Sequence, residues 1–325
     1  MTVSKALRDE SDISDSTKAR IKALARKMGY VPDSVAQGLR NRTTKLFGLI
    51  ISSTTNPVFG RLMMALEEKA HEMGYDLILA QSRNLPEREE VQIRRMLSRR
   101  VDGLFLSPVY RMEQSSPIYE ELRTNGTPVV ILGHQAPFCR GFTTVETDDI
   151  RGSYNATKHL LDLGHKRIAY FMGPTISPFA QERFEGYRYA LREAKIEVDD
   201  KLIFPAGTTI EEGEKAALQM LQENPGATAV QTFNDLVAIG TANVLLNQGL
   251  KIPQDISVAG FGNVLAAEHF RVPLTTIRQP KARLGTAAME TMLKLLAGER
   301  PESKRLPAEI AVRRSTAAPP KKSEG

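Results

Sequence analysis

Short apolar runs that alternate with longer amphipathic stretches constrain the fold of this chain most strongly. Residues 46–51 form a continuous apolar run with the length of a buried strand. Residues 61–73 follow, with Leu62, Leu66 and Ala70 at four-residue spacing on one helix face. Further strands are expected at 76–80, 103–106, 129–132, 168–172, 203–204, 229–233, 256–259, 275–277 and 310–312, and helices at 87–99, 118–123, 150–163, 183–194, 211–222, 236–247 and 281–296. This alternation predicts an α/β fold with doubly wound parallel sheets.

The alternation occurs twice, which predicts two similar lobes. We expect a first lobe over residues 45–163 and about 277–300, and a second over 164–276 and about 301–316. Residues 317–325 are rich in Pro, Lys and Ser, and we expect them to be disordered. Ligands of parallel sheets bind beyond the carboxyl ends of the strands, so two facing lobes predict a ligand cleft. The loops that follow the strands are rich in Asn, Asp, Thr, Arg and aromatic residues, which suits a hydroxylated ligand.

The composition disfavours several classes of protein. The chain has 325 residues and a single cysteine, Cys139, so it holds no internal disulfide. No apolar run approaches the roughly 18 residues that cross a bilayer, and Met1 leads into charged residues rather than a signal sequence. We therefore expect a cytoplasmic protein with no membrane partner. The five histidines lack metal-site spacing, and no GxGxxG, Walker A, GxSxG or HExxH motif occurs. Hence we expect no enzyme activity, no cofactor and no metal.

The excess positive charge is concentrated at the amino end. Residues 1–45 contain ten Lys or Arg against five Asp or Glu, a net charge of +5, whereas the whole chain carries +6. The same segment is helical in pattern, with a short stretch at 2–7 and a longer one in which Ile21, Leu24, Ala25 and Met28 share a face before Gly29. A weaker helical stretch follows Pro32. A basic helical segment is typical of a DNA contact, although a solvated surface would have the same composition.

This segment resembles the DNA-binding headpiece of the LacI/GalR repressor family. The resemblance rests on Thr2-Val3-Ser4-Lys5-Ala6-Leu7 and on Met28-Gly29-Tyr30-Val31-Pro32, with the residues between them. It implies a partial helix-turn-helix over residues 1–44 with a hinge helix at about 34–41, and a homodimer that binds a palindromic operator in double-stranded DNA. Thr2 or Ser4 would contact phosphate and Lys5 would read a base. Leu39 would wedge into the minor groove and Arg40 would contact phosphate. Alternatively, Lys5 would be an ordinary surface lysine, Leu39 a packing residue at a domain junction, and Arg40 a charge in a linker.

The headpiece departs from the family in one respect. The family's first helix, which precedes the recognition helix, has no counterpart after Met1. We expect the start of the natural protein to lie upstream of Met1. The alternative is a real short form, which would bind small molecules without competent DNA binding.

The rest of the chain also resembles the family, whose effector domain has the type I periplasmic-binding-protein fold. The motifs include Asn56-Pro57-x-Phe59, Arg183-x-x-Gly186-Tyr187, Asn234-Asp235 and the segment from Pro273 to Pro280, which contains Gln279. The resemblance implies that the effector, a sugar or related metabolite, contacts a set of six residues. They are Asn56, Phe59, Asp148, Arg183, Asn234 and Gln279. Asp148 and Asn234 could instead cap helices, and Arg183 could be structural. Gly262 stands where the family usually places a ligand-binding Asp, which leaves the ligand class open.

We therefore interpret the chain as a ligand-responsive, sequence-specific transcriptional regulator. The resemblance favours a repressor, although the sequence itself does not show whether the protein represses or activates. A transport binding protein of the same fold is disfavoured by the basic headpiece and the lack of a signal sequence. An α/β enzyme is disfavoured by the lack of a nucleophile or cofactor motif. The sequence does not identify the effector or the operator, or distinguish inducer from corepressor and dimer from tetramer.

Overall fold

The structure is a computed structural model that describes residues 2–7, 9–30 and 43–320. The chain divides into two compact units, Met1–Lys45 and Leu46–Gly325. The expected hinge helix at 34–41, with Leu39 and Arg40, lies outside the described residues.

The first unit contains two helices, α1 (Thr2–Leu7) and α2 (Asp15–Lys27). Ala6 is fully buried, and Lys22 pairs with Asp9 in the connection between the helices. Gly29 has a φ of +62°, the left-handed conformation predicted for the residue that ends α2. The apolar face of α2 is only partly covered, because Leu24 and Met28 are 55% and 73% exposed.

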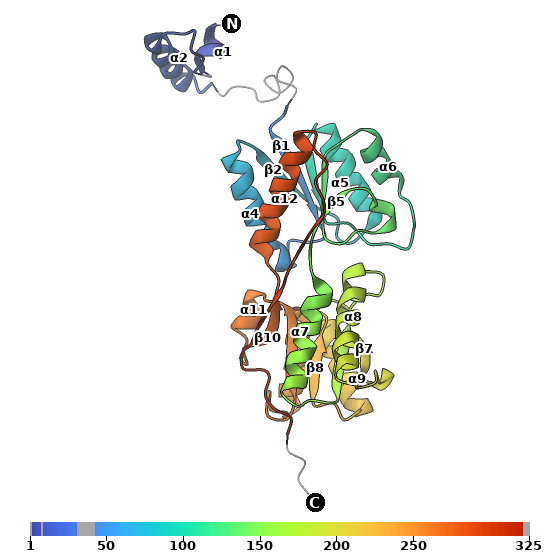
Figure 1. The fold of residues 1–325 in the computed structure, drawn as a ribbon. Helices are drawn as coiled ribbons and strands as arrows, with labels where there is room; N and C mark the ends of the chain where they lie inside the picture. The colour runs from blue at the N-terminus through green and yellow to red at the C-terminus, as the bar shows by residue number, and fades with distance from the viewer. Residues whose placement is uncertain (1, 8, 31–42, 321–325) are drawn as a thin grey trace, which may run out of the picture. The chain divides into compact units, whose positions relative to one another are not determined.

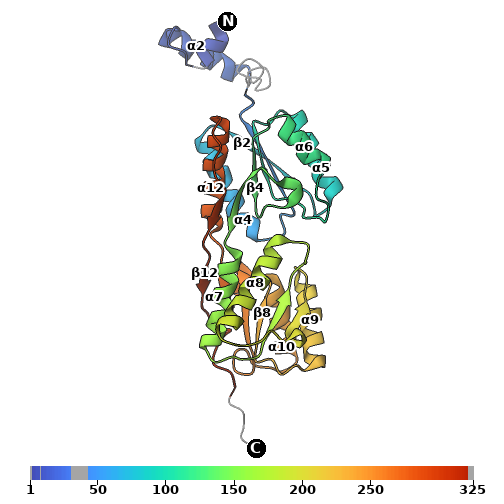
Figure 2. The same ribbon diagram turned by 45° about the vertical axis from the view of Figure 1, so that its right-hand side comes forward.

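The first lobe of the second unit is built on a six-stranded parallel sheet (Figures 1 and 2). The strand order is β11-β5-β4-β3-β1-β2. The strands are β1 (Leu46–Ile51), β2 (Asp76–Gln81), β3 (Gly103–Leu106), β4 (Val129–Leu132), β5 (Thr143–Thr147) and β11 (Lys304–Leu306). Helices α4 (Val58–Glu72) and α12 (Lys281–Leu296) cover one face, and α5 (Pro86–Ser98) and α6 (Pro117–Thr124) cover the other. A short 3₁₀ turn, η1 (Pro137–Cys139), joins β4 to β5. Phe47 and Ile50 of β1 are fully buried in the cores on opposite faces, as the apolar run predicts for a strand covered on both sides.

The second lobe repeats this plan. Its strand order is β12-β10-β9-β8-β6-β7, and only β12 runs antiparallel to its neighbour. The strands are β6 (Ile168–Met172), β7 (Ile203–Pro205), β8 (Ala229–Thr232), β9 (Ser257–Gly262), β10 (Thr275–Arg278) and β12 (Glu309–Ala311). Helices α7 (Asp149–Asp162) and α8 (Pro178–Glu193) cover one face, and α9 (Ile210–Glu223) and α10 (Asp235–Asn247) cover the other. Two short turns, η2 (Asp200–Leu202) and α11 (Leu265–Glu268), complete the lobe.

The chain crosses between the lobes three times, and two expected boundaries are wrong. Helix α7 belongs to the second lobe rather than the first, so the first crossing lies near Asp148 and not near residue 163. The reason is close packing: α7 contacts α8 and the strands β8, β9 and β10, with Gly152 against Phe261. Likewise β11 belongs to the first lobe, because it pairs with β5. The other two crossings follow β10 and β11.

Hydrogen bonds hold the first residue of the carboxyl-terminal tail, for which disorder was expected. The carbonyl oxygen of Ala317 accepts hydrogen bonds from His165 Nε2 (2.8 Å) and Ser257 Oγ (3.2 Å), and its backbone N–H donates to Ser257 Oγ at 3.1 Å. Backbone groups satisfied in this way give the segment a fixed position that its composition does not reveal. Residues 321–325 lie outside the described part of the chain. Among the described helices, none has the length and apolar character needed to cross a membrane.

Candidate functional site

The carboxyl ends of strands from both sheets meet between the two lobes. Tyr110, which follows β3, packs edge-on against Phe179 of α8 with ring centroids 5.7 Å apart. Lys281, at the start of α12, donates a hydrogen bond to the carbonyl oxygen of Asn263 after β9 at 3.0 Å. The interlobe cleft predicted from strand polarity is thus the place where the two lobes touch.

Arg183 lies at the centre of this region and is only 6% exposed. Its Nε donates to Asp149 Oδ1 at 2.6 Å, and another guanidinium nitrogen donates to the carbonyl oxygen of Phe233 at 2.8 Å. The guanidinium carbon lies 3.7 Å from the ring centroid of Phe261 and 4.8 Å from that of Phe233. The buried guanidinium group of Arg183 therefore has partners within the protein: an ion pair, a carbonyl oxygen and two aromatic rings. Arg183 lies on helix α8, which begins at Pro178 and so starts five residues before the helix expected over 183–194.

Asp148 and Asn234 both cap helices. Asp148 Oδ1 accepts the backbone N–H of Arg151 at 3.0 Å at the start of α7. Asn234 Oδ1 accepts the N–H of Val237 at 2.8 Å at the start of α10, and its amide donates to the carbonyl oxygen of Thr208 at 2.9 Å. Both alternatives foreseen for these residues are thus present. The carboxylate that faces Arg183 belongs to the next residue, Asp149.

Asp148 also lines an open pocket on the outer side of α7 and α8. The pocket has a volume of about 620 Å³ and is lined by Asp148, Ile150, Arg151, Tyr154, Tyr189, Arg192 and Glu193. Arg183 is not among the lining residues.

The remaining predicted effector residues lie at strand ends of the first lobe and at the crossings. Asn56 Oδ1 accepts the N–H of Val58 at 3.1 Å at the start of α4, and Phe59 packs against the core beneath that helix. Gln279, between β10 and α12, donates to the hydroxyl oxygen of Thr147 at 3.3 Å. Gln279 thus contacts the residue that precedes Asp148 in the chain, whereas the hydrogen bond of Asn56 is local to the start of α4.

Gly262, which stands where the family usually has a ligand-binding aspartate, has a φ of +137°, a conformation that favours glycine. Its position is close to the carboxylate of Asp235. A Cβ atom at Gly262 would lie 3.4 Å from Asp235 Oδ2. Asp235 is 1% exposed, accepts the N–H of Val264 at 2.8 Å and accepts the hydroxyl of Thr276. Burial raises the pKa of its carboxyl, although these hydrogen bonds and Lys281 oppose the rise. Asp235 was recognised from the sequence only as part of the Asn234-Asp235 motif, with no role of its own.

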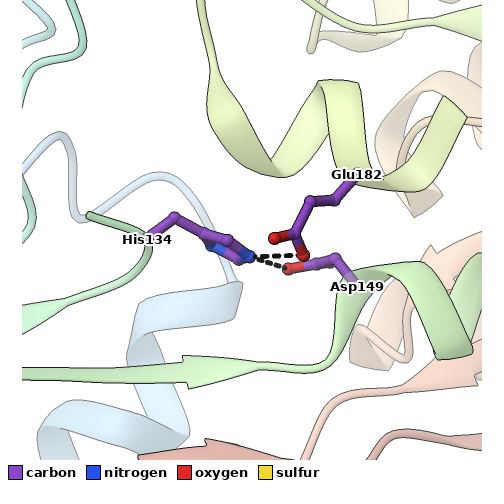
Figure 3. A group of neighbouring side chains, drawn as sticks. All are labelled: His134, Asp149 and Glu182. Atoms are coloured by element: carbon purple, nitrogen blue, oxygen red, sulfur yellow. Dashed lines mark hydrogen bonds and ion pairs between the residues drawn. The ribbon is translucent and has the colours of Figure 1, made fainter. Parts of the chain in front are cut away.

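A cluster of His134, Asp149 and Glu182 was missed by sequence reasoning, which assigned no histidine to chemistry (Figure 3). His134 Nε2 lies 2.9 Å from Glu182 Oε2 and 3.5 Å from Asp149 Oδ2. His134 follows β4 in the first lobe, whereas Glu182 lies on α8 in the second. A histidine directly after a buried strand, at the edge where a ligand is expected, was the available signal.

In the first unit, the predicted DNA contacts lie on α1. Thr2 is exposed, and the backbone of Ser4 is helical. Lys5 pairs with Asp12 and lies 4.0 Å from Glu10 Oε2. The hydrogen bonds from Lys22 and Lys5 lower the pKa values of Asp9 and Asp12, whereas slight desolvation opposes this.

Comparison with known proteins decides the family. Residues 44–316 match the profile "Periplasmic binding proteins and sugar binding domain of LacI family", and residues 1–33 match "Bacterial regulatory proteins, lacI family". The chain belongs to the LacI family. Members of this family are transcriptional regulators rather than enzymes, so this LacI-family chain is a ligand-responsive, DNA-binding regulator.

Individual relatives resemble the chain over nearly its whole length. The HTH-type transcriptional regulator DegA of Bacillus subtilis (strain 168) is 31% identical, covering 97% of this chain and 94% of its own. The HTH-type transcriptional repressor PurR of Vibrio atlanticus (strain LGP32) is 32% identical, covering 90% and 86%. The solved lac repressor dimer, bound to operator and the anti-inducer ONPF, is 26% identical with a TM-score of 0.84 and covers 98% and 95%. The predicted family and fold are therefore confirmed.

Proposed function

We propose that the chain acts as a homodimeric repressor that binds a palindromic operator through its first unit and a small effector between the lobes of its second. A repressor of bacterial genes would act in the cytoplasm, where the DNA lies. The effector would be a sugar or a related metabolite, in keeping with the sugar-binding domain to which residues 44–316 are similar.

The observation that carries this proposal is the arrangement of the interlobe region. Both parallel sheets direct their carboxyl ends to it, and the side-chain contacts across it come from loops and helix starts rather than from a continuous core. Such contacts can be exchanged for contacts to a ligand, so effector binding would favour one degree of closure over another. By linkage, operator affinity would change by the factor that separates the effector affinities of the two states.

The proposed effector contacts remain those implied by the resemblance. Asn56, Phe59, Asp148, Asn234 and Gln279 all lie at strand ends or helix starts. Modest rotation of the amide and carboxylate side chains would expose a polar group to the ligand, and Phe59 would offer it an aromatic face. Arg183 differs from them because Asp149 and the Phe233 carbonyl oxygen already engage it. We therefore propose that Arg183 orders the floor of the cleft in addition to facing the ligand.

The proposed DNA contacts are Thr2, Ser4 and Lys5 on α1, with Leu39 and Arg40 in the segment that follows. The excess of positive charge in residues 1–45 supports phosphate contact. Lys5 would exchange its ion pair with Asp12 for a base edge when DNA binds. Leu39 and Arg40 rest on the family resemblance alone.

A salt series on selected DNA tests the proposal. The full chain is used to select ligands from a randomised duplex pool, and the affinity for the best duplex is measured by fluorescence anisotropy between 50 and 200 mM salt. Six to ten phosphate contacts predict a loss of roughly 10³–10⁵-fold over this range. No retention of DNA even at low salt would contradict the proposal and favour the alternative of a small-molecule binding protein.

A further inference from the structure

The cluster of His134, Asp149 and Glu182 joins segments that the chain keeps far apart. His134 comes from the loop after β4, Asp149 from the first turn of α7 and Glu182 from α8 (Figure 3). His134 and Asp149 are nearly inaccessible, with side-chain exposures of 5% and 3%, and the Glu182 side chain is 21% exposed. A buried group from one lobe is thus held against two carboxylates of the other.

Each carboxylate divides its two oxygens between an arginine and the histidine. Asp149 gives Oδ1 to Arg183 at 2.6 Å and directs Oδ2 to His134 Nε2. Glu182 gives Oε1 to Arg305 at 2.8 Å and directs Oε2 to the same ring nitrogen. Arg305 also donates to Glu146 Oε1 at 2.7 Å. Because the arginines fix both carboxylates, their free oxygens converge on one position at His134 Nε2.

Charge balance identifies the cation that suits this position. Asp149, Glu182 and Glu146 carry three negative charges, and Arg183 and Arg305 carry two positive ones. A protonated His134 brings the sum to zero, which a poorly solvated site favours. A divalent metal on a neutral His134 would leave a net charge of +1 beside two guanidinium groups. The three ligand atoms lie within 4.8 Å of one another, but the electrostatics favour the proton over the metal.

The directions of the pKa shifts of His134 and Glu182 agree with a protonated His134 at this position. Burial alone would lower the pKa of His134, but the hydrogen bond to Glu182 and the charges of Asp149, Glu182 and Glu146 outweigh it and raise the pKa above 6.5. Burial alone would raise the pKa of Glu182, but His134 and Arg305 outweigh it and lower the pKa below 4.5. The other polar group at His134 is the Tyr110 hydroxyl, which donates to the histidine carbonyl oxygen at 3.0 Å.

We propose that protonated His134 is a latch that holds the two lobes of the effector domain together, and that its deprotonation releases them. The latch concerns the closure of the domain, and only its use in controlling operator affinity rests on the function proposed above. It makes ambient pH, or any ligand that displaces the imidazolium from the two carboxylates, a regulator of closure.

The direction of the pH dependence follows from the two groups. A histidine whose pKa is higher in the folded chain stabilises it fully below pH 6.5, and this stabilisation is lost as the pH rises through the raised value. A glutamate whose pKa is lower in the folded chain stabilises it above pH 4.5, and this is lost as the pH falls through the lowered value. The latch therefore stabilises fully between about pH 4.5 and 6.5, and it is lost as the pH rises through the raised pKa of His134 or falls through the lowered pKa of Glu182.

Histidine-selective NMR titration of the full chain tests the latch, with His134→Gln used to assign the signal. We expect His134 to titrate above about 6.5, the value of an unperturbed histidine, and to titrate at lower pH in Glu182→Gln. A midpoint below 6.5, or one that Glu182→Gln does not move, would overturn the proposal. So would uptake of one zinc ion per chain that His134→Gln abolishes, since the site would then be a metal site.

Thermal unfolding and solution scattering provide a second readout that needs no signal assignment. We expect the wild type to melt about 2–4 °C above His134→Gln at pH 6 and to lose this margin by pH 8.5. The exposed His71 on α4 provides the control, since His71→Gln should keep the wild-type pH profile. The radius of gyration of the wild type should increase between pH 6 and pH 8.5, whereas that of His134→Gln should stay constant. Equal pH profiles for both proteins would refute the latch, and none of these measurements involves DNA.

Discussion

Two neighbouring aspartates, Asp148 and Asp149, have different roles at the cleft. Asp148 caps α7 and lines the outer pocket, whereas Asp149 pairs with Arg183 and faces His134. Asp148 is the N-cap residue outside the helix, whereas Asp149 is the first helical residue, so the two carboxylates face different surroundings. The sequence motif identified the neighbourhood, but only the start of the helix determines which aspartate enters the cleft.

Replacement of Arg183 should cost stability as well as any ligand contact. Arg183→Ala would leave Asp149 buried without its guanidinium partner and would open space among Phe179, Phe233 and Phe261. Breaking such a pair costs about 3–5 kcal/mol. Urea unfolding should therefore show a large loss for Arg183→Ala.

Arg188 on the same helix provides the matched control. Its pair with Glu185 is largely solvated, with side-chain exposures of 44% and 34%, so Arg188→Ala should cost no more than about 1 kcal/mol. Similar losses for the two variants would show that Arg183 does not support the cleft.

The helices and strands that could be predicted are those with a clear local pattern of apolar residues. The strands at 46–51, 103–106, 129–132 and 168–172 and the helix at 281–296 have the predicted bounds, because their apolar residues are continuous or periodic. Strands β5 and β11 were missed. Thr143–Thr147 alternates polar and apolar residues weakly, and Lys304–Leu306 has only three residues. Their structure comes from pairing with each other across more than 150 residues of chain, which no local pattern encodes.

The contact between α7 and α8 depends on a glycine that lets the helices approach. A Cβ atom at Gly186 would lie 2.9 Å from Ser153 Cβ and from the Tyr154 backbone nitrogen, and closer still to the carbonyl oxygen of Ile150. Gly186→Ala should push the helices apart and lower the free energy of unfolding by about 1–3 kcal/mol. Chemical denaturation would measure this loss.

Gly60, near the start of α4, is the matched control because nothing lies within 4 Å of the Cβ it would gain. Gly60→Ala should be neutral or stabilise the chain by up to about 1 kcal/mol, since alanine restricts the unfolded chain and favours helix. A neutral Gly186→Ala would contradict the close packing of α7 on α8.

For the molecule as a whole, the two-lobe plan was predictable but the path of the chain between the lobes was not. Strand polarity placed the ligand region between the lobes, and the family resemblance agreed with it. The crossings depend on which sheet accepts α7 and β11, and this is decided by packing and pairing with distant residues. The interlobe histidine was missed for the same reason, since its partners come from other segments.

We propose that two copies of this chain bind the two halves of one operator. Symmetric assembly would require two equivalent half-sites, and each copy would contribute its own phosphate and base contacts. A duplex with a single intact half-site would engage only one of the two sets of contacts, so it would bind with less free energy than the symmetric duplex.

The most direct measurement compares the affinity of the full chain for the selected symmetric duplex with that for an equally long duplex in which one half-site is scrambled. We expect two chains per symmetric duplex and an affinity at least about 100-fold weaker for the scrambled one, the lower end of the gain that two linked contact sets provide over one. Equal affinities for the two duplexes, or one chain per symmetric duplex, would contradict it.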